Sequence, residues 1–517
     1  MVRHTALSAL LLALVAVPVA ARQPTLSYDL DLNDRADDLF KVTLTVEGLS
    51  PANAVYQFAS TAPGTYQVMN IGRFVRRFEA RDARGALVPT EQVSVNQWRL
   101  SDPARVRTIR YAIAETWDTK VEQNPVYLMC GTSIEADHVL INPHAVIGYP
   151  TGLQATPIRL RLRYPRGWKI GTALDRARDG VYHAATYDQL VDSPILLGRL
   201  SDARLMVTGV PVEIYTYSKT GKIQATQLLN AMDDMLQAAG RFLGRLPVDR
   251  YTFLYHFEDQ SAGAWEHAVS SEYVFHESEF TDSLGQYLTD IAAHEFFHIV
   301  TPLNIHSEII ERFNFVTPVP SQHLWLYEGT TEWAAHAMQL RAGLKSPEEY
   351  LAKVLQKMQV DRAVYDSTYS LRELALTSYS DSGQKQYANI YMRGALTAGL
   401  LDIRLLELSR GRQGLQDVIL ELARRFGKQR AFPESTFVDT LVALTHPEVR
   451  DFFARYVWES ERLPIKEYYA KLGIRLVEDP DGRPLRLELV PSPTAEQRLL
   501  REAWLGRKPG TAAAPKP

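Results

Sequence analysis

The stretch from Asp282 to Pro302, DSLGQYLTDIAAHEFFHIVTP, constrains the chain most, because it contains the pattern HEFFH. His294 and His298 stand four residues apart, so on a helix both imidazoles project from one face and can bind a single metal ion. Glu295 is turned aside from that face, where its carboxylate can act on a metal-activated water. The pattern therefore predicts one zinc ion per chain, two of its ligands and a general base.

The residues around this pattern favour a helix. Thr281, Asp282 and Ser283 offer side-chain oxygens that can cap its first turn. Thr301 and Pro302 are expected to end it, since proline has no amide hydrogen to donate. Leu284, Leu288 and Ile291 have the apolar spacing of a helix that is buried on one side.

A catalytic zinc ion needs a third protein ligand and an open position for water. Glu328, in the segment LWLYEGTTEWAAH, is separated from His298 by 29 residues and is the next candidate ligand. Glu332 lies four residues further on the same helical face. Its carboxylate can accept the N–H of a zinc-bound histidine and so fix the tautomer, although a solvated helix face is the alternative interpretation.

These segments together resemble one known family. HEFFH, the 29-residue gap and the run W-x-x-EG-T are similar to the glycyl aminopeptidases, metallopeptidase family sixty-one, of the thermolysin-like gluzincins. GAWEHAVSS, from Gly263 to Ser271, resembles the family segment G-G-L-E-H-x-x-S. YMRGA, from Tyr391 to Ala395, resembles the family segment Y-x-K-G-A.

The resemblance implies a zinc-dependent aminopeptidase that removes small amino-terminal residues such as glycine or alanine from peptides. It implies that the Tyr391 phenol donates a hydrogen bond to the oxyanion. It also places Gly263 and Glu266 on or beside an edge strand that binds the substrate, with Gly263 allowing close backbone approach. There the Glu266 carboxylate can hold the free ammonium group of a peptide.

Two alternative functions remain open at this point. An open substrate site would instead give a zinc endopeptidase, for which acetylation of the substrate amino terminus would not matter. Outside the enzymes, the chain would be an exported peptide-binding protein with an inactive metallopeptidase fold. Ala264 and Trp265 depart from the Gly-Leu of the family segment. We expect a bulky indole there to narrow or reshape the first side-chain pocket.

The pattern of apolar residues predicts an α+β multidomain fold. Apolar residues alternate with polar ones near residues 26–32, 40–46 and 158–164, which predicts sheets with one buried face and a β-sandwich-like domain over residues 22–210. A thermolysin-like catalytic domain is expected over 211–345. An α-helical domain that completes the active site follows over 346–475, beginning at the capping box Ser346 to Glu349.

Residues 476–517 are expected to form a carboxy-terminal tail whose last part is disordered. Members of the family often carry a PDZ domain at this end, and this segment is too short for one. We therefore do not expect these residues to bind the carboxy-terminal tail of a peptide as a PDZ domain does.

The amino-terminal residues predict export. Residues 1–21 have a basic start, an apolar run and small residues at the positions that a signal peptidase recognises, so we expect a periplasmic or secreted protein without a membrane span after cleavage. The net charge of -3 gives no indication of nucleic-acid binding. Cys130 is the single cysteine and cannot form an internal disulfide. The expected partners are peptide substrates; the patterns do not predict an oligomeric state.

Overall fold

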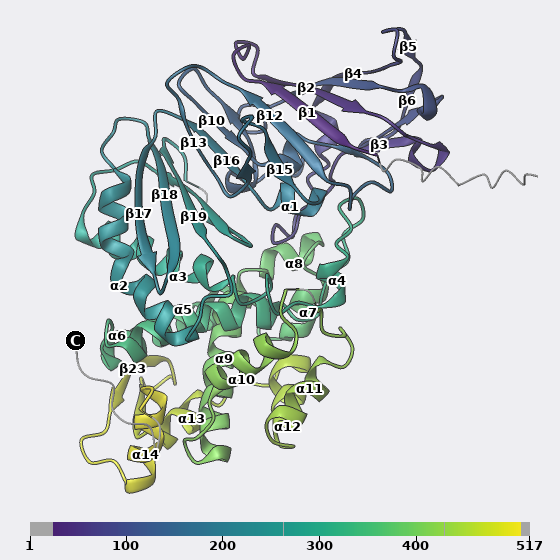
Figure 1. Cartoon of the computed structure of the whole chain (residues 1–517). Helices are drawn as coiled ribbons and strands as arrows, with labels where there is room; N and C mark the ends of the chain where they lie inside the picture. Colours follow the sequence, from purple (N-terminus) through teal and green to yellow (C-terminus); the bar gives the residue numbers. More distant parts are fainter. Residues whose placement is uncertain (1–23, 262, 429, 508–517) are drawn as a thin grey trace, which may run out of the picture.

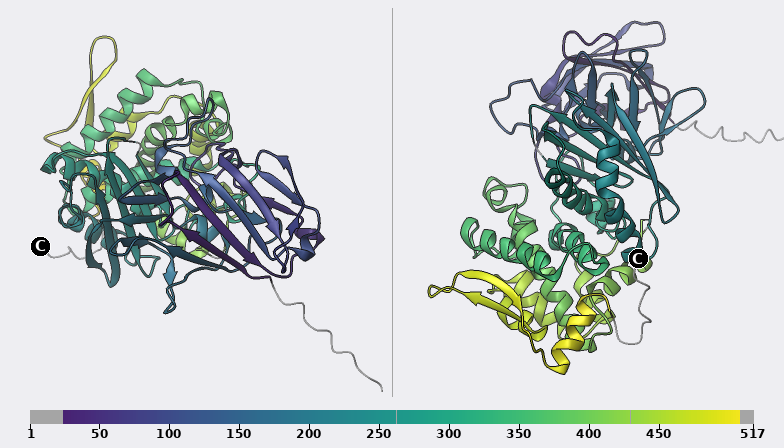
Figure 2. Two further views of the ribbon diagram at one scale, coloured as in Figure 1. Left: turned by 90° about the horizontal axis from the view of Figure 1, so that it is seen from above. Right: turned by 90° about the vertical axis from the view of Figure 1, so that its left-hand side faces the viewer.

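The computed structural model describes residues 24–507 except residues 262 and 429. The predicted export signal and the predicted disordered end, residues 508–517, lie outside the described residues. The chain forms a β-rich domain at one end and a helical region at the other, with a mixed sheet and helices between them (Figures 1 and 2). This is the α+β multidomain fold that the sequence predicts.

Among the described residues the β-rich domain contains three sheets and one short α-helix, α1 (Tyr187–Val191). Its strands are β1 (Leu26–Asp31), β2 (Leu39–Val46), β3 (Val55–Gln57), β4 (Val75–Arg81), β5 (Leu87–Val88), β6 (Thr90–Ser94), β7 (Gln97–Leu100), β8 (Thr108–Ala114), β9 (Ser133–Ile134), β10 (His138–Ile141), β11 (Tyr149–Pro150), β12 (Ile158–Arg163), β13 (Lys169–Thr172), β14 (Asp175–Arg176), β15 (Tyr182–Ala184) and β16 (Ile195–Gly198).

The largest sheet has the order β14-β15-β12-β1-β2-β8-β4-β5, and the two smaller sheets have the orders β13-β16-β10-β9 and β11-β3-β7-β6. The predicted alternation is confirmed in β1, where Leu26, Tyr28 and Leu30 are buried and the residues between them are partly exposed. Inward-facing side chains of all three sheets share one hydrophobic core, to which Cys130 also belongs as a buried free thiol.

The central part of the chain contains a five-stranded sheet of order β17-β18-β19-β21-β20. Its elements are β17 (Ser201–Val207), β18 (Val210–Ser218), α2 (Ala225–Leu243), β19 (Tyr251–Glu258), β20 (Gly263–His267), β21 (Ser270–His276), α3 (Asp282–Phe297), α4 (Glu308–Glu311) and α5 (Thr330–Ala342). Because β17 and β18 belong to this sheet, the change from one sheet system to the next falls between Gly198 and Ser201, before the expected boundary at residue 210.

The helical region packs against α3 and α5 and shares their hydrophobic core. Its helices are α6 (Pro347–Val364), α7 (Leu371–Leu376), α8 (Asp381–Gln386), α9 (Asn389–Ser409), α10 (Leu415–Arg425), α11 (Phe437–Leu444), α12 (Val449–Phe453) and α13 (Ile465–Lys471). The predicted capping box at Ser346 and Glu349 begins α6. No helix among the described residues is long and apolar enough to cross a membrane.

The segment expected to be a tail is folded over its described part. A hairpin of β22 (Ile474–Glu478) and β23 (Pro484–Leu489) precedes the helix α14 (Ala495–Trp504). Leu500 and Trp504 are buried in the core of the helical region, and the Trp504 ring lies edge-on to Tyr350 of α6. Burial of these apolar side chains anchors α14. The residue pattern predicted neither the hairpin nor this helix.

Candidate active site

Helix α3 carries the HEFFH segment and begins at the predicted cap. The Thr281 hydroxyl accepts a hydrogen bond from the Leu284 amide. The helix ends at Phe297, earlier than the expected end at Thr301 and Pro302, because residues 299–304 form turns. His298 is the C-cap residue and keeps a helical backbone (φ -60°, ψ -17°), so its ring still lies 4.8 Å from the ring of His294, centroid to centroid.

Glu328 reaches both histidines from a π-helical turn, η6 (Trp325–Gly329), which leads into α5. One of its carboxylate oxygens, Oε2, lies 3.5 Å from Nε2 of His294 and 3.5 Å from Nε2 of His298. Ligands bound tetrahedrally at 2.0–2.1 Å are separated by about 3.3 Å, so these distances suit a shared ion. The structure thus brings together the three predicted ligands.

Hydrogen bonds orient both imidazoles with Nε2 towards Glu328. Nδ1 of His294 lies 2.7 Å from Oε2 of Glu332, and Nδ1 of His298 lies 2.9 Å from the Thr301 carbonyl oxygen. Each Nδ1 therefore carries a proton, and Nε2 is the nitrogen of each ring that faces Glu328 and is placed to bind a metal. The donor set fits a metal ion, and Glu332 occupies the supporting position that the sequence predicts.

Charges around Glu332 keep its carboxylate ionised. Burial alone would raise the pKa of Glu332, but the Lys357 ammonium and the hydrogen bond with His294 hold it well below its usual range. Burial lowers the pKa of His298 to about 4, so that ring is neutral. Burial also lowers the pKa of His294, but Glu328 and Glu332 outweigh it and raise that pKa well above the usual value. The position between these groups therefore attracts a cation.

Glu295 and Glu266 place two further carboxylates beside the three ligands. One oxygen from each and one nitrogen of His298 lie within 4.8 Å of one another. Burial is the main cause that raises the pKa of Glu295 to about 8, and it also raises the pKa of Glu266 well above its usual range, with Glu328 and Glu295 adding to the effect. Such a group of acids favours the binding of positive charge.

Tyr391 reaches the site because two glycines let α9 cross the turn that carries Glu328. A Cβ on Gly329 would lie 2.6 Å from Cα of Gly394, and one on Gly394 would lie 2.8 Å from Cα of Gly329. This close crossing brings the Tyr391 ring to 5.6 Å from the ring of His294, with the Tyr391 hydroxyl 3.2 Å from that of Tyr387. Gly329 and Gly394, one from each sequence motif, thus allow the two helices to cross closely.

We expect Gly394→Ala to reduce peptide hydrolysis by about 10²-fold, because displacement of a positioning helix by about 1 Å can cost that much in rate. The added methyl group should also destabilise the fold by about 1–3 kcal/mol. Steady-state kinetics and thermal unfolding measure both effects. Gly399→Ala on the same helix is the control, since a Cβ there would meet nothing closer than 3.6 Å. Equal activity of the two variants would contradict a positioning role for this crossing.

Glu266 lies on β20, the edge strand of the central sheet, as the resemblance implies. The β-rich domain meets this strand: the Trp265 indole donates to the Pro63 carbonyl at 3.2 Å, and a Cβ on Gly64 would lie 2.5 Å from Oε1 of Glu266. Residues 63–66 thus form a wall of the site. Gly64 leaves the space that the Glu266 carboxylate occupies.

The structure places Gly263 at the start of β20 with a φ of +135°, a backbone conformation that favours glycine. No described heavy atom lies within 4 Å of the place that a Cβ would take there. Backbone conformation, rather than close approach of another part of the chain, therefore explains this glycine. The space beside it is free for a substrate.

Two aromatic residues of the site were missed in the sequence. Tyr66 of the β-rich domain has an unusual left-handed backbone (φ 47°), and its buried ring lies tilted against that of Tyr387, with centroids 5.0 Å apart. Its pKa is raised by burial and then by the charges of Glu328 and Glu266, which places it beside both carboxylates. The segment TAPGTYQ contains no spacing that marks Tyr66, and Tyr387 looks like ordinary packing four residues before Tyr391.

Comparisons with known proteins agree with this fold. The family models described as Peptidase M61 N-terminal domain and M61 glycyl aminopeptidase match residues 27–199 and 287–397 and together cover more than half of the chain. These matches show that the protein is a peptidase. The chain belongs to the M61 glycyl aminopeptidase family. No curated protein sequence gives a significant match.

Solved structures share the fold. An aminopeptidase N family protein from Idiomarina loihiensis superposes with a TM-score of 0.78 at 21% identity, over 88% of this chain and 79% of that one. Native leukotriene A4 hydrolase from Saccharomyces cerevisiae superposes with a TM-score of 0.52 at 12% identity, over 87% of this chain and 70% of that one. At these identities the likeness supports the fold alone.

Proposed function

We propose that this peptidase is a zinc-dependent aminopeptidase that removes amino-terminal residues from peptides. The ligands are His294, His298 and Glu328, two imidazoles and a carboxylate, which is a donor set that zinc commonly occupies. When bound there, the zinc ion lowers the pKa of a coordinated water and polarises the scissile carbonyl group. The preference for glycine or alanine rests on family membership.

Four further side chains would transfer the proton, stabilise the oxyanion, orient His294 and bind the substrate. Glu295 accepts the proton of the attacking water and returns it to the leaving amine. The Tyr391 hydroxyl donates a hydrogen bond to the oxyanion, while Glu332 holds His294 in the ligating tautomer. Glu266 accepts hydrogen bonds from the α-ammonium group and so sets the first peptide bond over the ion.

The position of Glu266 carries the proposal of amino-terminal cleavage. Its carboxylate lies within 4.8 Å of the ligand His298 and of Glu295, and no lysine or arginine among the described residues forms an ion pair with it. A partly buried carboxylate is stabilised by a cationic partner, and here the α-ammonium group of a peptide would be that partner. An acetylated or internal peptide segment offers no such charge.

A pair of substrates tests this function directly. We expect the purified protein to cleave a free-amino alanyl or glycyl arylamide but not its acetylated twin, and a chelator should abolish the cleavage. Equal cleavage of both compounds would favour the endopeptidase. Cleavage of neither by protein that contains zinc would favour the peptide-binding alternative.

The variant Glu266→Gln tests the anchor itself. Loss of a hydrogen bond to a charged group costs about 1.5–3 kcal/mol, so kcat/KM for the free-amino compound should fall roughly 10–100-fold. The matched control is Glu279→Gln, an exposed residue after β21 whose partner is Lys222. If Glu266→Gln and its control cleave the free-amino arylamide equally well, the carboxylate does not hold the amino terminus.

We also propose that the protein is exported. The pattern of residues 1–21, with Arg3 and His4 before an apolar run, supports this proposal. Detection of the processed chain in the periplasmic or secreted fraction, with an amino terminus close to residue 22, would be the expected result. An unprocessed chain in the cytoplasmic fraction would contradict it.

A further inference from the structure

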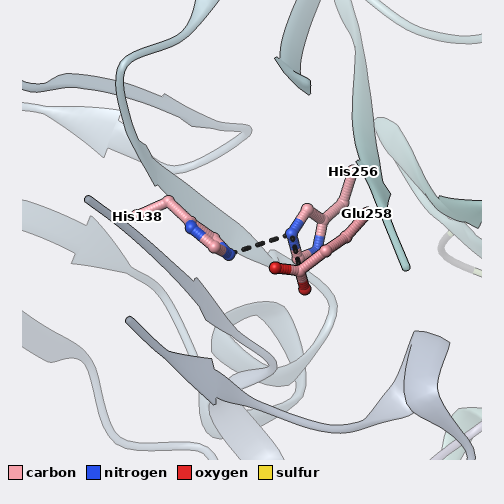
Figure 3. A group of neighbouring side chains, drawn as sticks. All are labelled: His138, His256 and Glu258. Atoms are coloured by element: carbon pink, nitrogen blue, oxygen red, sulfur yellow. Dashed lines mark hydrogen bonds and ion pairs between the residues drawn. The ribbon is translucent and has the colours of Figure 1, made fainter. Parts of the chain in front are cut away.

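A second group of metal-ligating side chains lies outside the site described above. His138 is on β10 of the β-rich domain, and His256 and Glu258 are on β19 of the central sheet. His256 and Glu258 are two residues apart on one strand, so both project from the same face, towards His138 (Figure 3). The three side chains therefore meet where the two domains are in contact.

The distances in this group resemble those at the candidate catalytic site. Nε2 of His138 lies 3.0 Å from Nε2 of His256, which in turn lies 4.0 Å from Oε2 of Glu258. Ligands of one tetrahedral zinc ion are about 3.3 Å apart. The distance between the histidines is shorter than this value, and the distance from His256 to Glu258 is longer. All three ligand atoms lie within 4.8 Å of one another.

Neighbouring groups hold both imidazoles in place. Nδ1 of His138 lies 2.9 Å from Oδ1 of Asp137, so the proton is on Nδ1 and the lone pair of Nε2 faces His256. The His138 ring stacks on Tyr217, with centroids 3.7 Å apart, and the His256 ring stacks on Trp117 at 5.0 Å. Both histidines are about 1% exposed. Burial lowers the pKa of each, which favours the neutral form that binds metals.

Glu258 connects the group to solvent. Its side chain is 14% exposed, and its other oxygen, Oε1, lies 3.7 Å from the ammonium group of Lys219. Lys219 is 42% exposed and is closer to Asp259, at 2.6 Å, so it does not need Glu258 as a partner. Oε2 therefore remains on the side of the histidines, 4.0 Å from Nε2 of His256.

We propose that His138, His256 and Glu258 form a second binding site, for a divalent transition-metal cation of the zinc class, that ties the β-rich domain to the central sheet. Two imidazoles and one carboxylate suit such a cation, and the Asp137 carboxylate behind His138 gives the carboxylate–histidine arrangement typical of zinc sites. In the absence of a cation, the two facing Nε2 atoms share one proton, and Glu258 has no role in that arrangement. Replacement of Glu258 should therefore reduce metal content only if the group binds a cation.

Metal content measured by mass spectrometry distinguishes these states. After dialysis against trace zinc, the wild-type protein should contain two zinc ions per chain and Glu258→Gln should contain one, with peptide hydrolysis retained. Asp259→Asn is the matched control: it removes a neighbouring carboxylate and the closer partner of Lys219, but it should keep two ions. One ion in the wild-type protein and in Glu258→Gln alike would overturn the proposal in favour of a shared proton.

A second measurement does not depend on the folding of Glu258→Gln. In a Glu328→Ala variant, which lacks a ligand of the proposed catalytic site, titration with zinc against a chromophoric chelator should still show one bound equivalent. No binding in this variant would overturn the second site. Because this titration does not use hydrolysis, its outcome is independent of the proposed aminopeptidase activity. Chelator should also lower the midpoint of thermal unfolding of Glu328→Ala, and an unchanged midpoint would exclude the role in joining the domains.

Discussion

Glu295→Gln is expected to lose nearly all peptide hydrolysis while it stays folded and keeps its metal. Glutamine has the shape of a protonated glutamic acid, and burial already raises the pKa of Glu295 to about 8. The substitution should therefore disturb the buried surroundings little. It removes the group that accepts the proton of the attacking water, and a positioned general base contributes about 10²–10⁴-fold to a rate.

The measurement is kcat for a free-amino arylamide, together with metal content and the midpoint of thermal unfolding. Glu311→Gln, an exposed glutamate on the short helix α4, is the control and should behave as the wild-type protein does. Turnover by Glu295→Gln above about a tenth of the wild-type rate would be incompatible with the proposed general base. Loss of metal in the same variant would show that the residue acts by holding the ion.

Glu328→Ala is expected to lose both the catalytic metal ion and activity. Oε2 of Glu328 faces Nε2 of both histidines at 3.5 Å, so the substitution leaves two ligands where a catalytic zinc ion needs three. Added zinc should not restore hydrolysis at concentrations that saturate the wild-type protein. Metal analysis and activity measured against added zinc test this result.

Glu332→Gln is expected to weaken metal binding less than Glu328→Ala does. Its carboxylate orients His294 without being one of the three ligands, and loss of such support typically costs 10–100-fold in metal affinity. Activity in Glu332→Gln should therefore return at higher zinc concentration. If Glu328→Ala is also rescued by zinc, the third ligand is another residue.

The residue pattern was enough to predict those parts of the site that depend on short separations along the chain. The helix period puts residues four apart on one face, so His294, Glu295 and His298 could be assigned from spacing, and the same period relates Glu328 to Glu332. The alternation of apolar residues likewise predicted strands such as β1 and β12. These relations follow from local backbone geometry, which a residue pattern records directly.

Contacts between segments far apart in the chain could not be predicted from residue patterns and became visible in the folded protein. The crossing at Gly329 and Gly394 depends on how α9 packs against η6, and no local spacing describes the close approach of two backbones. Tyr66 reaches Glu266 and Tyr387 from another domain, and His138 meets His256 across 118 positions of sequence. Such contacts result from the burial of whole faces of sheets and helices, because packing of the complete core sets the distance between elements.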